Sequence, residues 1–138
     1  MNKLNLLFTS LLLSGNLFFT SAQKTFYTCH EISVDEFYAW HEALSPIVVI
    51  DIRTKTEYLD KHIKNAIWAP SDSAIISMSD TLDADQKIII YDTSGNESLD
   101  ACLLLASKGK QSVFHVKDGF EEWEKLGHLV EKTTPENK

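Results

Sequence analysis

Hydrophobic and polar positions alternate along the chain in blocks that predict strands and helices in turn. The apolar runs at 47–52 and 87–91 are rich in isoleucine, which is typical of strands buried on both faces of a sheet. Before the first of these runs, Ser33 starts a Ser-Val-Asp-Glu sequence that predicts a capping box at a helix start. That helix places Phe37 and Trp40 on one face, together with Leu44, and ends before Pro46.

The same pattern continues over the rest of the chain. It predicts further strands at 26–30, 66–69 and 112–116, and further helices at 55–61, within 71–85, at 98–108 and at 119–126. Alternating strands and helices favour a parallel sheet covered on both faces, with its ligand crevice at the carboxyl ends of the strands. A chain of 138 residues has the length of one such domain.

The first 22 residues differ from the rest in composition. Lys3 precedes an apolar run over 4–19, and small residues end the segment at Ala22. We therefore expect a signal peptide over 1–22, a domain over 23–132 and a disordered tail over 133–138, with export to the periplasm or the extracellular space. An uncleaved membrane anchor is the alternative, but the apolar run is short and interrupted by small polar residues.

Charge narrows the possible partners. The chain has a net charge of −7, and removal of Lys3 with the leader leaves 12 basic and 20 acidic residues. Such acidity repels nucleic acid and anionic membranes, so we expect neither as a partner, and we expect a monomer. The five histidines show no paired metal-ligand spacing, so we expect no metal and no cofactor.

The segment 88–98 is the most informative in the chain. An apolar strand leads through a short Ser/Gly turn into a helical pattern, so backbone N–H groups converge at a helix N-terminus. A loop of this kind is suited to holding a negative group.

Three segments resemble signatures of the rhodanese family. The matching segments are 48–67, with Asp51-Ile52-Arg53, Glu57-Tyr58 and His62-Ile63; 91–98, the active loop; and 113–123, with a Gly-Phe pair and Trp123. The resemblance covers about 27–131 and implies a single rhodanese-like α/β domain with a five-stranded parallel sheet flanked by helices on both faces.

The resemblance implies a sulfurtransferase, but the active loop departs from the family pattern at two positions. Asp92 stands where the family has the cysteine that carries the persulfide, and Glu97 stands where it has an arginine that attracts anions. The spacing of six residues from Asp92 to Glu97 matches the sulfur-transferring members. Lys61 and Asp118 also replace usual glycines.

We therefore interpret the loop as a vestigial active loop without a catalytic residue. Its members are Asp92, Thr93, Ser94, Gly95, Asn96, Glu97 and Ser98. The resulting hypothesis is an exported rhodanese-like module that lacks sulfurtransferase activity and binds or regulates an unknown protein or small ligand. In the simplest interpretation Asp92 caps its own loop and helix. The alternatives are a sulfurtransferase that uses another thiol, a hydrolase with Asp92 as nucleophile, and a cation site formed by Asp92, Glu97 and Asp100.

The remaining residues of interest have structural interpretations. The resemblance implies that Asp51, Arg53, Glu57 and His62 support the base of the site, and Arg53 and Glu57 have the i, i+4 spacing of a helical ion pair. For Cys29 and Cys102 we expect two separate buried thiols, with a disulfide as the alternative.

Overall fold

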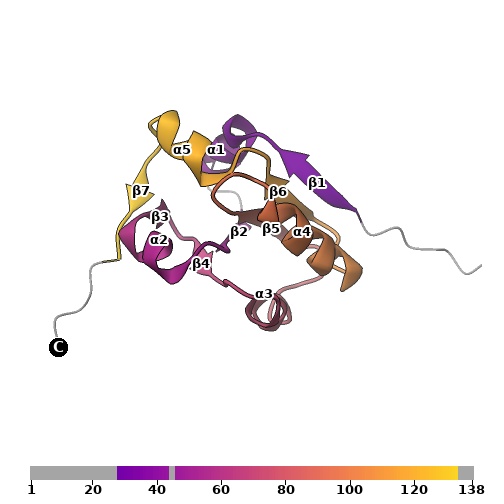
Figure 1. Cartoon of the computed structure of the whole chain (residues 1–138). Coiled ribbons are helices and arrows are strands. Elements are labelled where there is room, and N and C mark those ends of the chain that lie inside the picture. Colours follow the sequence, from indigo (N-terminus) through magenta and orange to yellow (C-terminus); the bar gives the residue numbers. More distant parts are fainter. Residues whose placement is uncertain (1–27, 44–45, 134–138) are drawn as a thin grey trace, which may run out of the picture.

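A computed structural model describes residues 28–43 and 46–133. It contains seven strands and five helices in this part of the chain (Figure 1): β1 Cys29–Ile32, α1 Val34–Glu42, β2 Ile47–Asp51, α2 Lys55–Asp60, β3 His62–Ile63, β4 Ile67–Trp68, α3 Asp72–Ser79, β5 Lys87–Tyr91, α4 Glu97–Ser107, β6 Val113–Val116, α5 Gly119–Lys125 and β7 Val130–Glu131. The expected signal peptide, its cleavage site and residues 134–138 of the expected tail lie outside the described residues.

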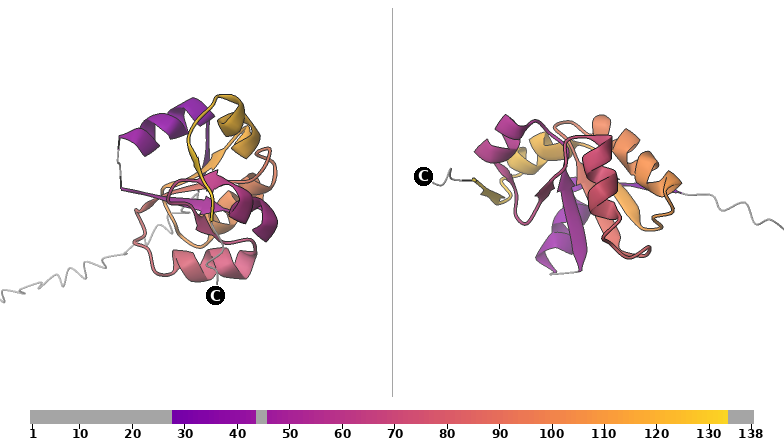
Figure 2. Two further views of the ribbon diagram at one scale, coloured as in Figure 1. Left: turned by 90° about the vertical axis from the view of Figure 1, so that its left-hand side faces the viewer. Right: turned by 90° about the horizontal axis from the view of Figure 1, so that it is seen from below.

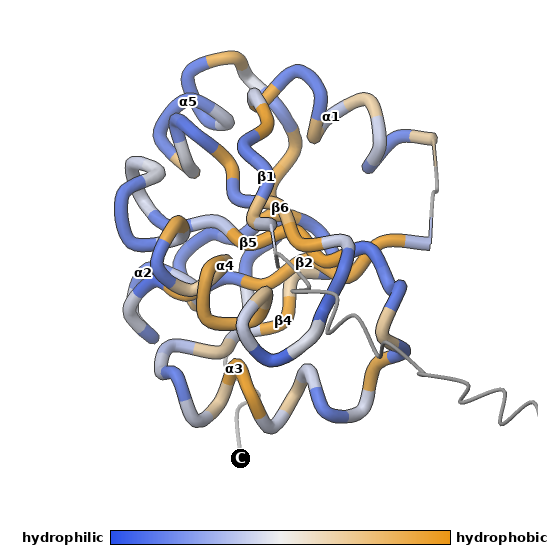
Figure 3. Tube along the Cα trace, turned by 90° about the vertical axis from the view of Figure 1, so that its right-hand side faces the viewer, coloured by the Kyte–Doolittle hydropathy of each residue, from blue (hydrophilic) through white to orange (hydrophobic). Residues whose placement is uncertain are grey.

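Five strands form one parallel sheet in the order β1-β6-β5-β2-β4. This confirms the predicted fold class, and β5 has the bounds that its apolar run predicted. Helices α1 and α5 lie on one side of the sheet and α3 and α4 on the other (Figure 2). The strands form an apolar centre inside more polar helices and loops (Figure 3).

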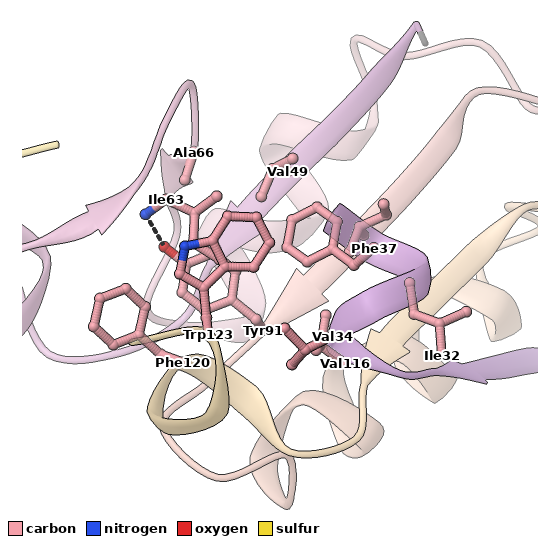
Figure 4. Packing of buried hydrophobic residues seen from close by; sticks show 11 residues of the cluster. Ile32, Val34, Phe37, Val49, Ile63, Ala66, Tyr91, Val116, Phe120 and Trp123 are labelled. Atoms are coloured by element: carbon pink, nitrogen blue, oxygen red, sulfur yellow. Dashed lines mark hydrogen bonds between the residues drawn. The ribbon is translucent and has the colours of Figure 1, made fainter. Parts of the chain in front are cut away.

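Each face of the sheet has its own hydrophobic core. On the first face, aromatic residues from α1, α5 and β5 pack together, including Phe37, Trp123 and Tyr91 (Figure 4). On the second face, Ile88 and Ile90 of β5 pack against Leu105 of α4. The alternate residues of β5 thus enter opposite cores, as expected for a strand buried on both faces.

The helix starts follow the local sequence. Ser33 caps α1 and Glu36 completes the predicted capping box, with the Glu36 N–H 3.2 Å from the Ser33 hydroxyl oxygen. A second capping box, which the sequence analysis missed, joins Thr54 and Glu57 at the start of α2. Because Thr54 caps the helix, Arg53 lies before the first turn of α2.

Three expectations differ from the structure. The first strand is Cys29–Ile32 rather than 26–30. The two-residue strands β3 and β7 form a small antiparallel pair that was not predicted. Finally, Cys29 and Cys102 form a disulfide with Cα atoms 5.5 Å apart, so the expectation of two separate thiols was wrong. The register of β1 on β6 explains the disulfide, because it brings Cys29 beneath α4, which carries Cys102.

Candidate functional site

The loop of residues 92–98 follows β5 at the carboxyl end of the sheet and leads into α4. Beside it lies a cavity of about 410 Å³. The residues that line this cavity are Ile52, Arg53, Thr54, Glu57, Pro70, Asp92, Thr93, Ser94, Asn96 and Glu97. We call it the loop cavity. Five of the seven loop residues predicted from sequence line this cavity, together with Arg53 and Glu57.

Asp92 fills the position at which an anion would be bound. Its side chain is 3% exposed. Its Oδ1 accepts the N–H of Gly95 at 2.8 Å, and its Oδ2 accepts the N–H of Glu97 at 3.0 Å. These are two of the backbone donors that converge at the start of α4. Their negative partner is therefore a side chain of the same loop.

Packing from α5 fixes the backbone of the loop. The N–H of Phe120 donates to the carbonyl of Asp92 at 2.8 Å, and that of Glu121 donates to Thr93 at 3.0 Å. Gly95 has φ +89°, and a Cβ there would come within 1.6 Å of the Lys117 carbonyl oxygen, so only glycine fits. The first turn of α5 and the residues just before it thus hold the backbone of the loop in place.

The Arg53 side chain is held by contacts with residues beneath the cavity. Its Nη2 lies 2.6 Å from Oδ2 of the fully buried Asp51 and 2.7 Å from the Lys61 carbonyl oxygen. Its guanidinium also stacks over the ring of Phe120 at 3.7 Å. Burial acts to lower the pKa of Arg53, but the hydrogen bond and charge of Asp51 outweigh burial and raise it. Arg53 therefore partners Asp51, and the structure contains no Arg53–Glu57 ion pair, contrary to the helical spacing.

Tyr91 extends this buried network and was not anticipated. Its hydroxyl donates to Oδ2 of Asp51 at 2.6 Å and accepts the Ile63 N–H at 3.1 Å (Figure 4). Burial, the charge of Asp51 and the hydrogen bond to it raise the pKa of Tyr91 well above its usual value. The available sequence signal was an aromatic residue at the end of the strand that leads into the loop.

Glu57 connects α2 to the loop. Its Oε2 completes the cap at Thr54, and its Oε1 accepts the hydroxyl of Thr93 at 3.1 Å. These hydrogen bonds, first that from Thr54, lower the pKa of Glu57. The carboxylate thus stays charged at neutral pH and faces the same cavity as Asp92 and Glu97.

His62 and Ser98 do not line the loop cavity. The Nδ1 of His62 lies 2.8 Å from the Tyr58 carbonyl oxygen, so it donates there, and the two rings stack at 4.1 Å. Ser98 is fully buried in α4, and its hydroxyl has no hydrogen-bond partner among the described residues. Both residues are therefore buried in the fold and lie outside the lining of the loop cavity.

The two positions where the family usually has glycine accept side chains without backbone strain. Lys61 is extended, with φ −156°, and its Nζ pairs with Glu124 at 2.8 Å. Asp118 has φ −104°. Neither backbone therefore requires glycine.

No group of three or more His, Cys, Asp or Glu side chains within 28–43 and 46–133 has the arrangement of a metal site. The three proposed cation ligands do not form one, and both oxygens of Asp92 already accept N–H groups. In the same ranges, no helix is both long enough and apolar enough to span a membrane.

Comparison with known proteins identifies the family. The model of the rhodanese-like domain matches residues 33–126, so the chain belongs to the rhodanese-like domain family. It is 31% identical over 81 residues to a protein of Allochromatium vinosum named sulfurtransferase, covering 59% of this chain and 75% of that protein. It is 29% identical over 77 residues to the thiosulfate sulfurtransferase GlpE of Coxiella burnetii, covering 56% and 71%.

Solved structures share the fold at low sequence identity. The NMR structure of a rhodanese-like domain from Anabaena matches with a TM-score of 0.68 at 23% identity, covering 78% of this chain and 86% of that one. A rhodanese-like domain protein from Staphylococcus aureus matches with a TM-score of 0.63 at 22% identity, covering 76% and 99%. These similarities establish the fold. They do not determine the chemistry, which depends on the residues of the loop.

Proposed function

We propose that this chain is an exported rhodanese-like protein that does not transfer sulfur and that acts as a binding or regulatory module through its modified active loop. The observation that carries the proposal is the Asp92 carboxylate, which accepts the N–H groups of Gly95 and Glu97. A carboxylate cannot form a persulfide, and it fills the position that an anionic sulfur would need.

The cysteines support the same conclusion. The chain has two cysteines, and Cys29 and Cys102 form a disulfide. Sulfur transfer through another thiol would therefore require prior reduction. Even after reduction, Cys102 would be buried in α4, away from the residues that line the loop cavity.

The electrostatics of the loop cavity disfavour an anionic substrate. Glu57, Asp92 and Glu97 line the cavity, and the charge of Arg53 is balanced by Asp51. Replacing a positive by a negative charge about 7 Å from a bound anion changes its energy by about 5 kcal/mol at an effective dielectric of about 20. Solvent and salt reduce this value, but half of it still weakens binding close to a hundredfold. We infer that the ligand presents a cationic or neutral group to the cavity.

A hydrolase with Asp92 as nucleophile is the second candidate. It would need a carboxylate oxygen free to attack, whereas both oxygens accept backbone N–H groups and the residue is 3% exposed. These contacts favour the binding role.

Production of thiocyanate from thiosulfate and cyanide tests the loss of activity. We expect the folded chain to give the rate of a protein-free control, under both oxidising and reducing conditions. Turnover that disappears in Cys102→Ala would contradict the proposal and identify a relocated thiol. Turnover that disappears in Asp92→Asn would instead identify chemistry at the loop.

Capture from the exporting compartment tests the binding role. A partner of the loop should be retained by the wild-type chain and lost from Glu97→Arg, which reverses one charge at the cavity. Asp83→Arg is the matched control. It makes the same change in net charge, and Asp83 precedes β5 at the opposite end of the sheet from the loop. Equal retention by both variants would exclude the loop as the binding surface.

A further inference from the structure

The two sulfur atoms of the Cys29–Cys102 disulfide have unequal surroundings. Cys102 lies in the middle of α4, is 0% exposed, and packs in the same core as Leu105 and Ala101. Cys29 is the first residue of β1 and is only partly buried. Cys29 is therefore the more accessible of the two cysteines to an external thiol in the folded chain.

The position of Cys29 in the sheet makes it easier to expose further. Among the described residues, β1 is at the edge of the sheet and pairs with β6 alone, over the four residues Cys29–Ile32. Strand ends open locally at much lower free energy than core strands. Helix α4 packs against β1 but also against β5, β6 and α3, and these further contacts hold Cys102 in place whether or not the sulfur atoms are joined.

We propose that the disulfide is a thiol-exchange site at which a small thiol or the dithiol of an oxidoreductase attacks Sγ of Cys29. In the first step a thiolate forms a bond to Cys29 Sγ, the Cys29–Cys102 bond breaks, and its electron pair leaves on Cys102 Sγ, which takes up a proton. In the second step another thiolate attacks the reagent sulfur in the mixed disulfide. The reagent leaves as its own disulfide, Cys29 becomes a thiol, and the two electrons gained by the chain come from the two thiols consumed.

Exchange at this site changes one part of the molecule. Oxidised, the disulfide fixes the start of β1 to α4, whose first turn supplies the Glu97 N–H to Asp92. Reduced, the start of β1 keeps its pairing with β6 and its packing against α4 but loses the covalent link, while α4 stays in its core. The disulfide is thus a redox-sensitive link between the first strand and the helix that follows the loop. Thiol exchange at Cys29 does not require the loop to transfer sulfur.

Peptide mapping of the folded full chain treated with reduced glutathione tests the proposal. After acid quenching, we expect the glutathione adduct on Cys29 and a free thiol at Cys102. That free thiol should resist alkylation under native conditions and react after denaturation. An adduct mainly on Cys102, or equal adducts on the two cysteines, would overturn the proposal, and so would resistance of the folded chain to a strong dithiol such as dithiothreitol.

Two single variants provide a second measurement. Cys102→Ser leaves a thiol at Cys29, and Cys29→Ser leaves one at Cys102. We expect iodoacetamide to label Cys102 at least about tenfold more slowly than Cys29, because labelling of a buried thiol requires opening. Similar rates in two variants with native circular dichroism would contradict the unequal access. If either variant fails to fold, the mapping on the native chain still decides.

Discussion

Replacing Asp92 by alanine tests whether its carboxylate stabilises the loop from within. The change removes an acceptor from the N–H groups of Gly95 and Glu97, which lie 2.8 and 3.0 Å from its oxygens. A hydrogen bond to a charged group contributes about 1.5–3 kcal/mol, so two of them contribute about 3–6 kcal/mol. Water entering the loop cavity would recover part of this loss. We therefore expect Asp92→Ala to lower the free energy of unfolding by about 3 kcal/mol.

Chemical denaturation followed by circular dichroism measures this value, with the disulfide kept intact. A loss of about 3 kcal/mol corresponds to a fall in Tm of roughly 12–15 °C for a domain of this size. Asp92→Asn should also be destabilised, because its amide nitrogen would face one of the two N–H donors. Asp100→Ala is the control, since Asp100 is an exposed acid in the first turn of the same helix and should cost at most about 1 kcal/mol.

The reasoning would be refuted by an Asp92→Ala variant within about 0.5 kcal/mol of the wild type. The Asp92 carboxylate would then make no net contribution to the free energy of unfolding. Equal losses in Asp92→Ala and Asp100→Ala would show a general effect of charge at the helix start instead of the two specific hydrogen bonds.

Three further predictions concern the support of the site and the processing of the chain. Tyr91→Phe should lose about 2–3 kcal/mol of stability in denaturation, because it removes one of the buried donors to Asp51, which keeps Arg53, and takes the acceptor away from the Ile63 N–H, whereas Tyr38→Phe on the surface should lose almost nothing. Because the pKa of Glu57 is lowered in the folded state, its carboxylate contributes to the stability of the fold above the unfolded pKa near 4.5, and this stability is lost as the pH falls through the folded pKa. Denaturation measured as a function of pH should show the loss, which should be absent in Glu57→Gln. Mass spectrometry of the exported protein should find a chain beginning after Ala22, and a full-length species fixed in the membrane would contradict the predicted signal peptide.

Most of the sheet could be predicted from sequence because its strands are long enough to show a pattern. The run at 87–91 consists of isoleucines between Lys87 and Tyr91 and gave the bounds of β5 directly. The pair β3 and β7 could not be found this way, since two residues are too short for any periodicity. Their pairing depends on contacts between distant parts of the chain.

The disulfide and the ion pair show a different limit. Cys29 and Cys102 are 73 residues apart, and only the register of β1 against β6 brings them together. The Arg53–Glu57 prediction failed because the helix begins at Lys55. The signal for this was present in the sequence, since Thr54 and Glu57 have the spacing of a capping box. The i, i+4 spacing thus predicted the wrong partner for Arg53, whereas the capping motif indicates the correct start of α2.

The position of the loop followed from its strand–turn–helix pattern, but its surroundings did not. The hydrogen bonds that hold it from α5 come from a turn more than twenty residues later in the chain. Phe120, which covers Arg53, lies in the same first turn of α5 and is distant in sequence from the residues it supports. Side chains contributed by another element are the part of a site that periodicity does not show.

The most direct test of the central claim is the intact mass of the chain after treatment with thiosulfate, for the wild type and for Asp92→Cys combined with Glu97→Arg. The account predicts no gain in mass for the wild type and the gain of one sulfur atom for the double variant, because the loop length and its N–H donors remain suited to an anion. The single variant Asp92→Cys should gain much less, since Glu97 still repels the thiolate and the incoming anion. Sulfur on the wild-type chain, or none on a well-folded double variant, would contradict the claim that two side chains in an otherwise intact loop account for the loss of sulfur transfer.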